Sequence, residues 1–118
     1  MDVMENIGRE PTTIHGTVHG PHDNLDYSGT YSVAHGNISD DFHIYTLEWN
    51  PQHLYFFVDG INYYTFDRIT LMRDGDWVYD HPFSIVLNLA VGGTWPKSPD
   101  STTIFPQKMY ISYIRVYQ

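Results

Sequence analysis

Two acidic side chains, Asp2 and Glu5, lie three residues apart in a run that favours a β-strand. Strand side chains alternate between the two faces of a sheet, so residues three apart should point to opposite faces. The carboxylates can share a face only if one extra residue bulges out between them, and such bulges recur beside active sites. We expect Met4 to be that residue. Paired carboxylates on one face are what hydrolysis of a glycosidic bond requires, one as acid and one to attack or to activate water.

Histidine provides the next candidate, in the strand-like run of residues 14–19. Alternation puts His15, Thr17 and His19 on the same face of that strand. His19 is interpreted either as a structural residue or as part of a site. A zinc site made of His15, His19 and His22 is the weaker interpretation, because four strand residues of ~3.3 Å each would separate the first two histidines by ~13 Å.

Two further side chains are candidates for sugar binding. Trp95 lies between Gly93 and Pro96 in an expected loop, where an exposed ring would stack on a pyranose. Asn88 interrupts an otherwise apolar strand, so it is either a satisfied buried amide or a group that reaches sugar hydroxyls. Trp49, in contrast, ends an apolar strand and is expected in the core.

The hydrophobic pattern predicts an all-β protein, because apolar residues recur with period two along most of the chain. About eight short strands are expected, among them residues 14–19, 54–58, 62–66, 84–91 and 109–117. Residues 84–91 form a nearly continuous apolar run, which indicates a strand buried on both sides. Asp59-Gly60 predicts a type I′ hairpin turn, which needs positive φ at both central residues. A short helical turn is expected near Ile69 to Met72.

Composition excludes several kinds of partner. The 118 residues include 14 acidic and 6 basic side chains, which gives a net charge of −8. Nucleic acids and anionic membranes both require basic patches, so neither is expected as a partner. Cysteine is absent, which excludes disulfides and thiolate metal sites. Aromatic residues make up 16%, ten of them Tyr, and this suits a surface on which sugars stack.

These features resemble glycoside hydrolase family 16, the laminarinase-type β-glucanases. The family signature reads Glu-x-Asp-x-x-Glu, and Asp2 and Glu5 match its second and third acids, so its first acid would immediately precede Met1. The resemblance continues in order through residues 14–19, 40–49, 57–60, 77–83, 87–96 and 105–117. It implies a concanavalin A-like jelly-roll β-sandwich, of which residues 1–118 would be the C-terminal portion of the catalytic domain.

The resemblance also assigns roles to the candidate residues. Glu5 would be the general acid that protonates the glycosidic oxygen and then the base that activates water. Asp2 would lie between the two glutamates and support the nucleophile. His19 would lie close to the acids, where it could hydrogen-bond a carboxylate or the sugar, while Asn88 and Trp95 would bind the substrate in the cleft.

The resulting hypothesis is a secreted, retaining endo-β-1,3-glucanase for laminarin-like or mixed-linkage glucans, in which this chain alone lacks the nucleophile. It would act with a missing N-terminal half, or associate with itself. Two alternatives are a lectin-like glucan-binding module and a strand-exchanged β-sandwich without activity. Related enzymes bind a structural calcium through an Asp in the last strand, where this chain has Ser112, so we expect no calcium and no other cofactor.

Overall fold

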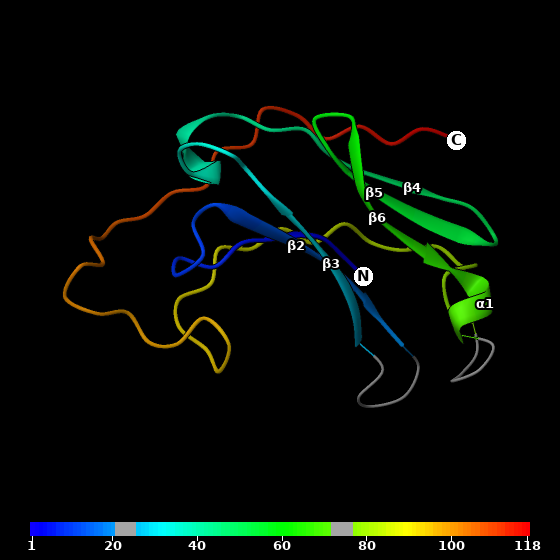
Figure 1. Ribbon diagram of the computed structural model, residues 1–118, viewed down its shortest axis with the longest axis horizontal. Coiled ribbons are helices and arrows are strands. Elements are labelled where there is room, and N and C mark those ends of the chain that lie inside the picture. The colour runs from blue at the N-terminus through cyan, green and yellow to red at the C-terminus, as the bar shows by residue number, and fades with distance from the viewer. Residues whose placement is uncertain (21–25, 72–76) are drawn as a thin grey trace. The chain divides into compact units, whose positions relative to one another are not determined.

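The computed structural model describes residues 1–20, 26–71 and 77–118, and its regular structure is almost entirely β (Figure 1). One antiparallel sheet has the order β1 (Asp2–Glu5), β2 (Thr13–His19), β3 (Asp26–Ser32). The other, also antiparallel, has the order β4 (Tyr45–Trp49), β5 (His53–Val58), β6 (Ile61–Asp67). A 3-10 turn, η1 (Ile38–Asp40), and one helical turn, α1 (Arg68–Leu71), complete the described elements. The expected all-β class is confirmed.

The chain divides into two compact units, Met1–Pro82 and Phe83–Gln118. Both sheets belong to the first unit, and the described residues of the second unit are not assigned to any strand or helix. No helix in the described part of the chain is both long and apolar enough to cross a membrane.

The core of the first unit lies between its two sheets. On β5, Leu54, Phe56 and Val58 are completely buried, as the alternation of strand side chains predicts for one face. Two clusters form around them: Val18, Leu54, Phe56, Phe66, Trp77 and Tyr79 in one, and Ile14, Ile38 and Val58 in the other. Because both clusters draw on β2 and β5, burial of these side chains holds the sheets face to face.

Two glycines allow the sheets to approach closely. A Cβ atom on Gly16 would lie 2.3 Å from the hydroxyl oxygen of Tyr63, and one on Gly29 would lie 2.4 Å from the Cβ of Tyr64. Gly16 and Gly29 are register partners on β2 and β3. The two tyrosines face this seam in succession because the register of β5 with β6 shifts beside Phe56, which leaves Tyr63 as an extra residue on β6.

The predicted hairpin turn is confirmed. Asp59 and Gly60 connect β5 to β6 with φ angles of 50° and 80°, both in the left-handed region that a type I′ turn requires. The expected helical turn also forms, as α1 (Arg68–Leu71), whereas Met72 lies outside the described residues.

Two predicted strands are wrong. Residues 84–91 and 109–117 are not in strands, and their apolar side chains are largely exposed, as at Val86 (78%) and Tyr110 (71%). A strand needs backbone partners as well as a suitable pattern, and neither segment has a hydrogen-bonded neighbour strand in the described residues. The described chain therefore has six strands rather than about eight.

The expected burial of Trp49 is also wrong, since the residue is 49% exposed. Trp49 pairs with the buried Leu54, so its ring is on the core side of the sheet. It is, however, the last residue of β4, which is an edge strand. The ring therefore lies at the rim of the core, where it borders a hollow of about 320 Å³ that Tyr79 and Asp80 also line.

Candidate active site

A bulge in β1 sets the geometry of the two candidate acids. Asp2 is the register partner of Thr17 and Glu5 is the partner of His15, so three steps along β1 match two steps along β2. The extra residue lies between Asp2 and Glu5, where Met4 was expected. Since Thr17 and His15 lie on the same face of β2, both acids share that face. The predicted bulge and the shared face are confirmed.

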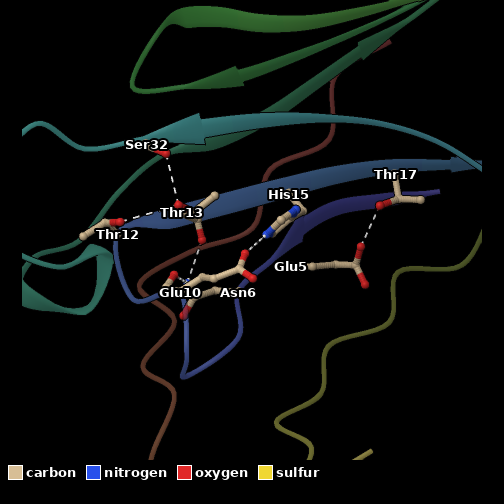
Figure 2. Close-up of polar contacts among 8 residues, drawn as sticks. All are labelled: Glu5, Asn6, Glu10, Thr12, Thr13, His15, Thr17 and Ser32. Carbon is tan, nitrogen blue, oxygen red and sulfur yellow. Dashed lines mark hydrogen bonds and ion pairs between the residues drawn. The ribbon is translucent and has the colours of Figure 1, made fainter. Parts of the chain in front are cut away.

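Glu5 is held by a hydroxyl group of the neighbouring strand. Thr17 Oγ1 donates a hydrogen bond of 2.7 Å to Glu5 Oε2, as Figure 2 shows. Thr17 is only 9% exposed, so its hydroxyl is fixed in a largely dry environment. A charge-assisted hydrogen bond of this kind restricts the direction in which the carboxylate points.

Asp2 belongs to a chain of three side chains that crosses all three strands of the sheet. Nε2 of His19 lies 2.6 Å from Asp2 Oδ2, and Nδ1 of the same ring lies 2.7 Å from Asp26 Oδ1. Burial by itself lowers the pKa of His19, but the hydrogen bonds to the two carboxylates outweigh it and raise the pKa above its ordinary value of 6.5. The imidazolium form is thereby favoured.

A second ion pair flanks the acids at the β1–β2 connection. His15 Nε2 lies 2.9 Å from Glu10 Oε2, and the side-chain amide of Asn6 donates to the carbonyl oxygens of Glu10 and Thr13 (Figure 2). These contacts tie the connection to the start of β2. They therefore help to fix the end of β1 that carries Glu5.

The structure brings together Asp2, Glu5 and His19 from the sequence-based set, on one face of the first unit. Asn88 and Trp95 belong to the second unit. Asn88 is exposed and is not in a strand, so its expected place within a buried strand is wrong. Trp95 is 41% exposed and lies in a turn, which agrees with the expected loop.

The zinc interpretation gains no support from the described residues. The rings of His15 and His19 engage different carboxylates, Glu10 for the former and Asp2 with Asp26 for the latter. The third histidine of that interpretation, His22, lies outside the described residues. In the described part of the chain, no three His, Asp or Glu side chains are grouped so as to hold a metal ion.

Sequence reasoning missed Asp26 and Glu10. Asp26 reaches His19 because the two are register partners across β2 and β3, and a register cannot be read from the hydrophobic pattern of either strand alone. Glu10 reaches His15 from the turn that precedes β2. The one available signal was the excess of acidic residues around the histidines near the start of the chain.

Comparison with known proteins decides the family. The sequence profile of Glycosyl hydrolases family 16 matches residues 1–115. The chain belongs to this family. Across its whole length it is similar to a beta-glucanase of Rhodothermus marinus, with 35% identity over 125 residues, and this match covers 44% of the relative.

Solved structures of similar sequence share the fold. An endo-beta-1,3-glucanase from Pyrococcus furiosus superimposes with a TM-score of 0.83 at 42% identity, covering 88% of this chain and 41% of the other. The laminarinase catalytic domain from Thermotoga petrophila gives a TM-score of 0.81 at 38% identity, covering 87% and 43%. The family 16 chain thus spans less than half the length of these relatives, and the expected jelly-roll class is confirmed.

Proposed function

We propose that this chain forms part of the catalytic domain of a retaining endo-β-1,3-glucanase that hydrolyses laminarin-like or mixed-linkage β-glucans. The observation that carries the proposal is the bulge that sets Asp2 and Glu5 on one face of the sheet. Without the bulge, the two carboxylates would lie on opposite faces of the sheet and could not act on the same glycosidic bond. Membership of family 16 and the similarity to glucanases support the same assignment.

Glu5 is the proposed general acid and base. In the first step its carboxyl proton passes to the glycosidic oxygen as an attacking carboxylate bonds to the anomeric carbon, which releases the leaving glucan. In the second step Glu5 takes a proton from water, whose oxygen displaces the enzyme carboxylate and restores it. Thr17 keeps Glu5 Oε2 fixed, so that the other oxygen is directed at the bond.

The attacking carboxylate is assigned to the position before Met1, on the strength of the family signature. Retaining enzymes hold their two carboxyl groups ~5–5.5 Å apart, and a residue two positions before Asp2 on an unbroken strand lies on the same face as Asp2. In a protein that carries a glutamate there, Asp2 lies between the two groups. Its negative charge is shared with His19, which limits repulsion of the nucleophile.

Three finer parts of the proposal concern partners and location. Asn88 and Trp95 contribute to the glucan-binding surface, the exposed Trp95 ring by stacking on a pyranose. Residues 84–91 and 109–117 become strands by pairing with polypeptide outside this chain, which covers their exposed apolar side chains. The protein is secreted, because a polysaccharide substrate has to be met outside the cell.

Laminarin hydrolysis tests the proposal, with the chain extended to the length of its family 16 relatives and with the 118-residue chain alone. We expect Glu5→Gln to lower kcat of the extended protein by about 10²- to 10⁴-fold, the usual contribution of a general acid or base. Glu48→Gln on the exposed face of β4 is the matched control and leaves kcat unchanged. The 118-residue chain alone should show little or no turnover.

The stereochemistry of the first product separates mechanisms. Proton NMR during the reaction should show the β-anomer first, as double displacement demands. An α-anomer as first product, or full activity in Glu5→Gln, contradicts the proposal. Glucan binding without hydrolysis by the extended protein points instead to a binding module.

A further inference from the structure

The ring of His19 has a carboxylate at each of its two nitrogens. Asp2 approaches from β1 at 2.6 Å from Nε2, and Asp26 approaches from β3 at 2.7 Å from Nδ1. The second contact follows from strand pairing, since His19 and Asp26 are direct register partners. The three side chains are each about half exposed, at 48%, 43% and 65% for His19, Asp2 and Asp26.

This arrangement specifies a protonation state. A neutral imidazole carries one N–H and offers a lone pair at its other nitrogen, while an ionised carboxylate can only accept hydrogen bonds. Two ionised carboxylates at both nitrogens are therefore satisfied only by the imidazolium, which donates to each. If the ring lost a proton, one carboxylate would face a lone pair and would have to turn away.

The other described groups around His19 do not oppose this state. Among the described residues, the titratable side chains in contact with His19 are Asp2, Asp26 and Tyr79, whose hydroxyl donates to the backbone carbonyl of His19. Burial raises the pKa of Tyr79 to about 12, with the charges of Asp26, Tyr64 and Asp2 adding to the effect, so this phenol stays neutral near pH 7. No cation among the described side chains lies in this set.

We propose that Asp26 is a positioning residue that keeps His19 doubly protonated and turned toward Asp2. Asp26 acts through His19 and has no direct part in bond cleavage. The imidazolium in turn holds Asp2 at a fixed angle and offsets its charge beside the candidate acids. This inference rests on the proposed function for its catalytic meaning, but the state of the His19 ring can be measured without any activity.

The test follows the imidazole nitrogens of His19 by NMR in the 118-residue chain, from about pH 5 to about pH 9. In the unsubstituted protein both nitrogens should carry protons at neutral pH. In Asp26→Asn the titration midpoint of His19 should fall by about half a pH unit or more, because one opposite charge is lost. Asp26→Glu should bring the titration midpoint of His19 most of the way back to its value in the unsubstituted protein.

Asp67→Asn is the matched control, since it removes a carboxylate from another His–Asp pair, that of His53. It should leave the His19 midpoint unchanged. A neutral His19 ring with a single N–H at neutral pH in the unsubstituted chain would refute the inference, even if Asp26→Asn failed to fold. An unshifted midpoint in a folded Asp26→Asn would refute it as well.

Activity adds a separate readout. In the extended protein, the ratio of kcat/KM between the unsubstituted enzyme and Asp26→Asn should rise in the pH window between their two His19 midpoints, because in that window only the unsubstituted enzyme keeps the imidazolium. A shifted midpoint with a kcat/KM ratio that stays constant across this window would refute the link from His19 to Asp2. If the extended protein has no glucanase activity but the His19 nitrogens behave as expected, the proposed function fails while the assignment of Asp26 stands.

Discussion

The contact between Thr17 and Glu5 is the residue-scale feature on which the candidate acid depends. Thr17→Val keeps the shape of the side chain and removes the hydroxyl that donates to Glu5 Oε2 at 2.7 Å. We expect the free energy of unfolding to fall by about 1–2 kcal/mol, because a partly buried carboxylate loses its donor. Urea denaturation measures this change. Thr30→Val on β3 is the control and should change the free energy of unfolding by less than about 0.5 kcal/mol. If Thr17→Val were as stable as the unsubstituted chain, the contact between Thr17 and Glu5 would not contribute to stability.

His19 gives the fold a pH dependence whose sign follows from its environment. Its folded-state pKa is raised above the unfolded value of 6.5. The ion pairs with Asp2 and Asp26 therefore stabilise the fold fully below about pH 6.5, and this stabilisation is lost as the pH rises through the raised folded pKa. The difference in free energy of unfolding between the unsubstituted chain and His19→Gln should shrink over that rise. A difference that stays constant between about pH 6 and about pH 9 would rule out the imidazolium as its source.

At the scale of elements, the seam between the sheets depends on two glycines that differ in what opposes a methyl group. In Gly29→Ala the new atom meets Cβ and Cγ of Tyr64, which are held by the backbone of β6. In Gly16→Ala the new atom meets the outer ring atoms of Tyr63 and of the buried Phe56, which lie farther from the backbone than Cβ and Cγ of Tyr64. We expect Gly29→Ala to cost about 1–3 kcal/mol of unfolding free energy and Gly16→Ala less. Thermal or urea denaturation measures both.

Gly8→Ala is the matched control for this pair, since a Cβ there would meet nothing within 4 Å. Its free energy of unfolding should change by no more than about 0.5 kcal/mol, or rise slightly because alanine restricts the unfolded chain. If Gly29→Ala were as stable as Gly8→Ala, the sheets would not be as close at this seam as Tyr64 indicates.

The two bulges show which elements the sequence can predict. The strand over residues 54–58 and the Asp59-Gly60 turn are predicted correctly, because both depend on neighbours along the chain. The β1 bulge was predictable only because Asp2 and Glu5 match a family signature. Their spacing in a regular strand would put them on opposite faces, whereas the signature requires both on the same face. The bulge at Tyr63 carries no such mark, since two successive tyrosines are compatible with either face. Asp26 was missed for a related reason, as its contact with His19 arises from pairing between strands.

At the scale of the whole molecule, residues 84–91 and 109–117 are the segments whose sequence pattern and structure disagree. Both segments have the composition of buried strands, and both are exposed without a neighbour strand in the described chain. The apolar pattern indicates that these segments are suited to a buried environment. A strand forms, however, only when a neighbouring backbone pairs with it through hydrogen bonds. The relatives are more than twice as long as this chain. The part of their length that this chain does not match is where partner strands for these two segments would be found.

These exposed segments predict association of the 118-residue chain. Side chains such as Val86, Leu87 and Leu89 are 78%, 53% and 55% exposed, and apolar surface of this kind beside unpaired backbone groups favours pairing with another chain. We expect light scattering to detect oligomers and the urea midpoint to depend on protein concentration. Leu87→Lys combined with Leu89→Lys, two positions that would share one face if residues 84–91 paired as a strand, should reduce the oligomer fraction, because charges oppose burial in a new sheet. Ile69→Lys, at a 72% exposed position of α1, should leave it unchanged. A monomer with a concentration-independent, cooperative transition would instead mean that the second unit buries these side chains within its own chain in solution.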